Sequence, residues 1–136
     1  SFRATLSGEI VNIGGYDDII LRVYSNRGQS TQNVLNSFRM VTRSVSPPPK
    51  LGWKWTIDFT CRSVNDGGIL GVLATSSQFD YTDDSYTLET LGAIVSNTNS
   101  SFDTSVEQFL DFTIEFDYYN QSNNIKTTIA TIERIF

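Results

Sequence analysis

Residues 53–61 show a strict alternation of apolar and polar side chains. Trp53, Trp55, Ile57, Phe59 and Cys61 alternate there with Lys54, Thr56, Asp58 and Thr60. Because successive side chains of a strand point to opposite faces, this pattern predicts a strand with one buried and one solvated face. Both tryptophans of the chain fall on the apolar face, so a second layer has to cover a large apolar surface.

Residues 109–119 repeat this pattern in the second half of the chain. Their apolar positions are Leu110, Phe112, Ile114, Phe116 and Tyr118, and the alternating polar positions are Asp111, Thr113, Glu115 and Asp117. Two strands of this kind need partner strands on the other side of a core. An antiparallel β-sandwich provides them.

Weaker alternation predicts further strands, separated by turn residues. They are expected over residues 2–13, with a bulge, and over 19–24, 34–45, 69–75, 86–95 and 125–136. The sequence Asn65-Asp66-Gly67-Gly68 is the strongest hairpin signal, and Gly71 suggests close packing or a bulge. Polar residues predict loops over 76–85 and 96–105. Three prolines at 47–49 predict a rigid connector rather than a proline-rich ligand motif.

The expected fold is therefore all-β: one domain over residues 1–136, built as an antiparallel β-sandwich of about eight strands. Eight strands in two sheets is the number found in a jelly roll, so we expect a jelly-roll-like arrangement. An immunoglobulin-like sandwich is the alternative, because it has a similar number of strands.

Composition excludes several kinds of chemistry. The 136 residues include no histidine, which removes Ser-His-Asp and Cys-His nucleophile systems and the commonest metal ligand. The single cysteine, Cys61, rules out an internal disulfide, and its place on the apolar face predicts a small core residue rather than a reactive thiol. We therefore expect a protein that is not an enzyme and has no metal site built on histidine.

The charge is distributed unevenly along the chain. Residues 1–62 hold eight Lys/Arg against four Asp/Glu, and residues 63–136 hold two against eleven, for a net charge of −5. If strands from the two halves interleave, these charges meet within one molecule. No dense basic patch appears, so we expect no nucleic-acid partner, and no apolar run approaches the roughly 20 residues that cross a bilayer.

The segment Phe79–Tyr86 holds the candidate binding residues. These are Asp80, Tyr81, Asp83, Asp84 and Tyr86. The carboxylates are the type of ligand that Ca²⁺ accepts, and the tyrosines could stack on a sugar ring, although the spacing is not that of an EF-hand. An ordinary solvated acidic loop is the alternative interpretation.

Two other groups of residues have a functional and a structural interpretation. Asp111, Glu115 and Asp117 could supply the paired carboxylates of a glycosidase, or they could form the solvated face of a strand. Trp53 and Trp55 could form a platform for a carbohydrate, but their face also carries Ile57 and Phe59, which favours the core.

The chain resembles the projecting β-sandwich domains of small icosahedral RNA virus coats. The resemblance rests on size, on short strands rich in Ser, Thr and Asn, on the connector Pro47–Pro49, on the lack of disulfides and on an apparent start inside a longer chain. It covers the whole chain without a diagnostic motif, so no functional residue is carried over. It implies a dimer or trimer at a virion surface or outside the cell, with contact to a host receptor or glycan.

Three other functions are compatible with the sequence. One is a carbohydrate-binding module or lectin that uses the 80–86 segment and exposed tyrosines such as Tyr118 or Tyr119. Another is a bacterial or phage adhesin or fibre domain, whose composition is indistinguishable from that of a coat domain. An enzyme comes last, because it rests on carboxylates alone.

Overall fold

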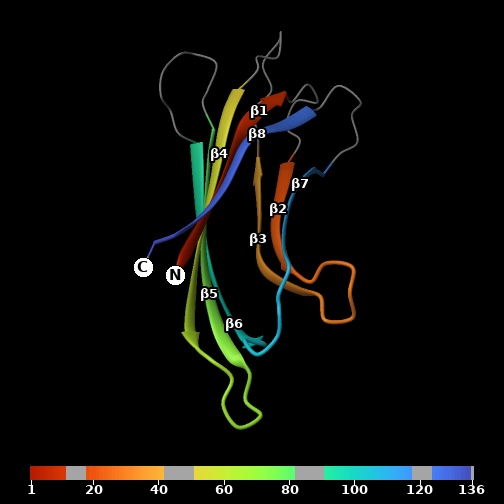
Figure 1. The fold of residues 1–136 in the computed structure, drawn as a ribbon. Helices are drawn as coiled ribbons and strands as arrows, with labels where there is room; N and C mark the ends of the chain where they lie inside the picture. Colours follow the sequence, from red (N-terminus) through yellow and green to blue (C-terminus); the bar gives the residue numbers. More distant parts are fainter. Residues whose placement is uncertain (12–17, 42–50, 82–90, 118–123, 136) are drawn as a thin grey trace.

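Two antiparallel sheets face each other in the computed structural model, which describes residues 1–11, 18–41, 51–81, 91–117 and 124–135 (Figure 1). The strands of this part of the chain are β1 (Phe2–Val11), β2 (Asp18–Ser25), β3 (Asn33–Val41), β4 (Leu51–Ser63), β5 (Gly71–Tyr81), β6 (Leu91–Phe102), β7 (Leu110–Phe116) and β8 (Asn124–Arg134). The prediction of an all-β antiparallel sandwich of about eight strands is confirmed. The described residues contain no helix that is long and apolar enough to cross a membrane.

The larger sheet has five strands in the order β6-β5-β4-β1-β8, and the smaller sheet has three in the order β3-β2-β7. β1 pairs with β8, and β2 pairs with β7, so strands from the two ends of the chain lie side by side in both sheets. This nested pairing of early with late strands is the jelly-roll-like feature of the fold. β4, β5 and β6 form a meander beside β1.

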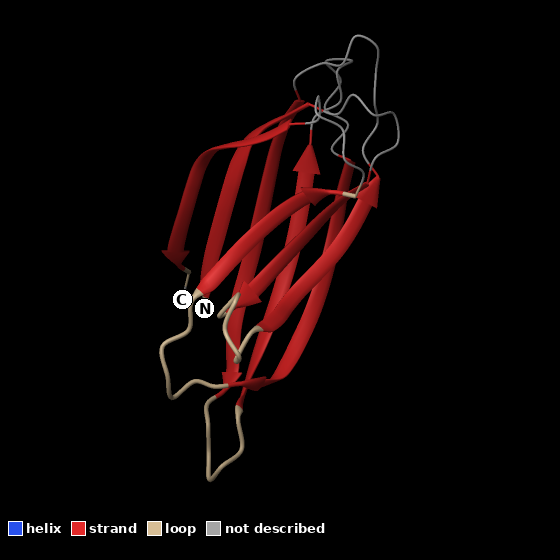
Figure 2. Ribbon diagram, turned by 90° about the vertical axis from the view of Figure 1, so that its right-hand side faces the viewer, coloured by secondary structure: helices blue, strands red, loops and turns tan. Residues whose placement is uncertain are grey.

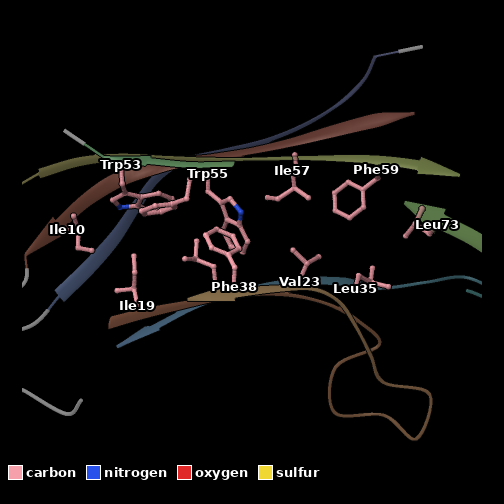
Figure 3. Packing of buried hydrophobic residues seen from close by; sticks show 13 residues of the cluster. Ile10, Ile19, Val23, Leu35, Phe38, Trp53, Trp55, Ile57, Phe59 and Leu73 are labelled. Carbon is pink, nitrogen blue, oxygen red and sulfur yellow. The ribbon is translucent and has the colours of Figure 1, made fainter. Parts of the chain in front are cut away.

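The apolar face of β4 forms the centre of the core, as its alternation predicts. Trp53, Trp55, Ile57 and Phe59 are buried and face residues of β2 and β3, among them Ile19, Val23, Leu35 and Phe38 (Figure 3). Phe112 of β7 meets Trp55 and Phe59 edge-on, with ring centroids 5.9 and 6.3 Å apart. Each fully buried side chain of this size contributes roughly 1.5–3 kcal/mol. The tryptophan face is therefore core and not an exposed platform.

The hairpin predicted at residues 65–68 is present. Asp66 and Ile69 exchange two backbone hydrogen bonds of 2.9 Å, and Gly67 and Gly68 between them have φ values of 55° and 86°. Two consecutive residues with positive φ are the signature of a type I′ turn, which explains the pair of glycines.

Gly71 starts β5 at a point where other segments approach its backbone closely. A Cβ added there would lie 2.7 Å from the carbonyl oxygen of Ser63 and 2.7 Å from Cγ2 of Thr104. The pairing of β5 with β6 also shifts register between Gly71 and Leu73. The close packing predicted for this glycine as one alternative is confirmed, and the register shift beside it has its extra residue in β6 and not in β5.

Two segments that were expected to be loops are strands where the structure describes them. β5 continues through residues 76–81, and β6 continues to Phe102. The physical reason is that Ser77 is fully buried on the inner face of β5, where its Oγ accepts a 2.6 Å hydrogen bond from Nε1 of Trp55. A small polar residue with a buried partner fits a core strand as well as an apolar one does.

The prediction that Cys61 is a core residue is wrong. The side chain is exposed, and its S–H donates to the carbonyl oxygen of Ser63 at 3.3 Å. Phe59 is the last buried residue of β4, and the pairing of β4 with β5 shifts register between Cys61 and Ser63. The alternation therefore continues past the point where the smaller sheet stops covering β4.

Register shifts also occur in two other strand pairs. In β3, Leu35 is the extra residue opposite β2, so Leu35 and Asn36 are both buried. The bulge expected near Gly8 is present, but its extra residue, Thr128, lies in β8 and not in β1.

Candidate functional site

The candidate binding residues of the 80–86 segment fall only partly within the described residues. Asp80 lies in β5 opposite Lys54 and Gly92, and Nε2 of Gln78 donates to its carboxylate at 3.1 and 3.4 Å. Tyr81 is the last residue of β5, opposite Trp53 and Leu91. Asp83, Asp84 and Tyr86 lie outside the described residues. Within the described ranges, no group of three or more Asp, Glu, Cys or His side chains is placed to hold a metal ion.

The three carboxylates of β7 and its end each face an arginine of the first half of the chain. Arg22 pairs with Glu115, Arg39 with Asp117, and Arg27 with Asp111 at 3.8 Å. All six residues lie on the solvated side of the smaller sheet or at its ends. The basic and acidic halves of the sequence thus meet across strands. This arrangement is a ladder of exposed ion pairs, which fits the solvated-face interpretation rather than a pair of carboxylates around a substrate.

The described loops gather at one end of the sandwich (Figure 2). They connect β2 to β3, β4 to β5, and β6 to β7. Among the residues that the structure describes, side chains of Asn26, Asn65 and Thr104 at this end bond to backbone groups of distant segments. This end is the first of two candidate binding surfaces.

Asn26 ties the β2–β3 loop to the segment that precedes β7. Its N–H donates to the carbonyl oxygen of Phe109 at 2.7 Å, and its Oδ1 accepts the N–H of Phe109 at 3.0 Å. Its Nδ2 donates to Oε1 of Gln108 at 2.7 Å. Asn26 is buried and has a φ of 52°, a left-handed conformation that asparagine tolerates better than most residues. The backbone N–H and the side-chain oxygen of Asn26 thus form the same pair of hydrogen bonds with Phe109 that two paired strand residues form with each other.

Asn65 ties the β4–β5 hairpin to the same segment from the other side. Its Oδ1 accepts the N–H groups of Gly71 and Thr104 at 2.9 and 3.0 Å. Its Nδ2 donates to Oδ1 of Asp103 at 2.6 Å. The carboxylate of Asp103 also accepts the hydroxyl and N–H of Ser105, and these bonds, with that of Asn65, hold the pKa of Asp103 below its ordinary value. Residues 103–109 are thus fixed at both ends.

A cavity of about 430 Å³ lies beside this fixed segment. Its wall combines amide, hydroxyl and carboxylate side chains with a few apolar ones. The wall includes Gln29, Asn33, Phe102, Val106 and Glu107. On the other side of the segment, a second hollow of about 260 Å³ is mainly apolar and includes Phe2, Cys61 and Leu110. The size and the mixed wall of the first cavity suit a small polyhydroxylated ligand.

The second surface is the edge of the larger sheet. β8 is the last strand in the sheet order, and the side chains of residues 129–134 are exposed. Ile129 and Ile132 expose 57% and 65% of their surface, although they point to opposite faces of the sheet. By contrast, Ile125 at the start of β8 packs against the core. The second half of β8 runs with β1 toward the neighbouring chain ends, away from the smaller sheet (Figure 1).

No protein-family model, curated protein or solved structure matches this chain.

Sequence reasoning missed both surfaces. Asn26 and Asn65 stand in segments with turn composition, and asparagine at a turn is a signal only for local structure. Their partners lie 82 and 38 residues away in the sequence. The apolar side chains of β8 do not indicate by themselves that the strand lies at an edge, which only the strand order shows.

Proposed function

We propose that this domain is a non-enzymatic assembly and attachment module, used as the projecting domain of a virus coat uses its β-sandwich. In this role it associates with copies of itself and presents one end to a host surface. Its place is then a virion surface or another extracellular structure. Neither nucleic acid nor a membrane interior is a partner of the domain.

The exposed edge strand β8 is the observation that carries the proposal. Soluble proteins protect sheet edges, because unpaired backbone groups beside apolar side chains recruit other strands. Ile129 and Ile132 stand on both sides of this edge, and both are more than half exposed. Pairing with another chain would satisfy the free backbone groups of β8 and cover its exposed isoleucines.

The non-enzymatic part of the proposal rests on composition and pairing. The chain has no histidine. The carboxylates of β7 that offered an acid–base pair are each next to an arginine.

The attachment part of the proposal draws on the loop end. The cavity beside residues 103–109 is rigidly framed, and its amide and carboxylate groups suit the hydroxyls of a glycan. The same observation favours a second candidate function, a carbohydrate-binding module. For such a module, a sugar present at 100 times its Kd would stabilise the fold by about 2.7 kcal/mol, which a thermal melt detects.

Light scattering behind a sizing column, across a range of concentrations, tests the assembly function. We expect a dimer or trimer whose share rises with concentration. A strict monomer at every concentration would remove the assembly function and leave the carbohydrate-binding module as the better candidate.

Thermal melts with and without Ca²⁺ test the acidic segment. If Asp80, Asp83 and Asp84 form a calcium site, Ca²⁺ raises the melting temperature, and Asp83→Asn combined with Asp84→Asn abolishes the rise. If Ca²⁺ leaves the melting temperature unchanged, the segment is an ordinary acidic one.

A further inference from the structure

The two sides of the sandwich are closed differently. On one side β3 packs against β5 and β6, and asparagines join the sheets there. Nδ2 of Asn97 donates to the carbonyl oxygen of Leu35 at 2.7 Å, and Nδ2 of Asn36 donates to that of Val95 at 3.2 Å. On the other side, β8 extends the larger sheet, and its residues 129–134 remain exposed. β8 is the edge strand on the open side.

We propose that a second copy of this chain pairs its β8 antiparallel with this β8 across a two-fold axis. The two five-stranded sheets then form one continuous sheet of ten strands. This inference rests on the proposed assembly function and specifies the surface that the assembly uses.

The bulge at Thr128 decides which residues can meet across the axis. On the side of β1, Ala130 and Ile132 lie opposite Leu6 and Ala4, so they share the inner face. Ile129 lies opposite Ser7 and shares the outer face. Thr128 has no partner in β1, so the alternation restarts there.

Residues that lie directly opposite in an antiparallel pair point to the same face. Every symmetric register centred on a residue of β8 satisfies this condition, provided that Thr128 of each copy is skipped, and two of these registers pair nearly all of the strand. One is centred on Ala130 and places Ile132 opposite Thr127 of the partner subunit. The other is centred on Ile129 and places Ile132 opposite Ile125 of the partner subunit.

The charges of β8 favour antiparallel self-pairing. Lys126 stands near its start and Glu133 near its end. In the register centred on Ala130, Lys126 falls opposite Glu133 of the partner subunit, and the symmetry makes this pair twice. A parallel pairing in register would instead place Lys126 beside Lys126 of the partner subunit.

The acidic edge of the smaller sheet is a poor alternative. β7 is also an edge strand, and its solvated positions are acidic, at Asp111 and Glu115, with Asp117 just beyond its end. A second copy paired there would bring like charges together, which is unfavourable. The apolar, charge-complementary edge is that of β8.

Disulfide trapping tests this arrangement. In a Cys61→Ser background, which removes the only native thiol, Ala130→Cys and Ile129→Cys each place a cysteine at one of the two symmetric centres. Directly opposite residues of paired strands are close enough for a disulfide. Thr98→Cys, an exposed position on the edge strand β6, is the matched control. Thermal melts of all three variants confirm that they fold.

The expected result is that mild oxidation converts most of the chain into a reducible, disulfide-linked dimer for Ala130→Cys or Ile129→Cys, while Thr98→Cys forms little of this covalent dimer. If light scattering shows a dimer but neither centre crosslinks faster than Thr98→Cys, the interface lies elsewhere and this inference is wrong, although the assembly function stands. If the chain is monomeric at every concentration, both are wrong.

Discussion

Single polar side chains hold the loop end of this sandwich together. Asn26 and Asn65 each bridge two segments, and both use the amide as an acceptor for backbone N–H groups. A buried N–H that loses its acceptor costs roughly 1–3 kcal/mol. At this scale, therefore, the frame of the cavity depends on two residues that make little contact with the apolar core.

Two variants of Asn26 separate the contribution of its side-chain hydrogen bonds from the cost of its left-handed backbone conformation. Asn26→Gly keeps the left-handed backbone but removes both side-chain bonds, and we expect it to lower the free energy of unfolding by about 1–2 kcal/mol. Asn26→Ala removes the same bonds and adds a left-handed alanine, at a further cost of about 1–2 kcal/mol. Urea denaturation of the two variants measures both steps. Equal stability of the two variants would contradict the role assigned to φ.

Asp58 gives a prediction of pH dependence. Arg3 donates to both oxygens of Asp58, at 2.6 and 2.8 Å, and this bonding lowers the pKa of Asp58. A carboxylate whose pKa is lower in the folded state stabilises the fold above its unfolded pKa, and this contribution is lost as the pH falls through the folded pKa. Wild type should therefore lose more stability in acid than Asp58→Asn does.

Melting temperatures of both proteins between about pH 7 and pH 2.5 check this expectation. Arg3→Gln is the control, because it removes the partner of Asp58 and should also flatten the acid limb. If melting temperature falls with pH in the same way for wild type and both variants, the ion pair of Arg3 and Asp58 does not contribute to the pH dependence of stability.

At the scale of elements, the sequence determined most of the fold but not the extent of every strand. The alternation in β4 and β7 and the turn at Asp66-Gly67-Gly68 were sufficient, because their signals are local and strong. β5 and β6 extend into residues with loop composition, since Ser77 is satisfied by Trp55 and Asn97 by Leu35. Such partners are distant in sequence, so periodicity cannot indicate them. The exposure of Cys61 likewise depends on where the other sheet ends.

Gly71 is the position at which one element limits the approach of another. Gly71→Ala should destabilise the fold by about 1–3 kcal/mol, because the new Cβ would meet Ser63 O and Thr104 Cγ2 at 2.7 Å and Phe102 O at 3.0 Å. Adding Thr104→Ser removes one contact but leaves both carbonyl oxygens, so it should restore only part of the loss. Chemical denaturation measures both variants, and an unchanged stability of Gly71→Ala would show that the 102–104 segment moves aside at little cost.

At the scale of the whole molecule, the two sheets are joined on the side where β3 packs against β5 and β6. The cavity lies at the loop end, and β8 lies exposed at an edge of the larger sheet. The sequence predicted association with a second copy but not the surface, because edge position follows from strand order and not from the pattern within β8. In the middle of the sheet, the same strand would bury Ile132, which lies on the inner face, but not Ile129, which lies on the outer face. In this order, β8 leaves them exposed at the margin of the larger sheet.

Light scattering on a matched pair of edge variants tests the account most directly. Ile129→Lys with Ile132→Lys adds to β8 the charge that protects natural sheet edges, and Ile94→Lys with Thr98→Lys does the same on the opposite edge, β6. All four positions are exposed, so both variants should fold. We predict that wild type and the β6 variant are dimers at the same concentrations and that the β8 variant is a monomer. A monomeric wild type, or a β8 variant that associates as wild type does, would contradict the account.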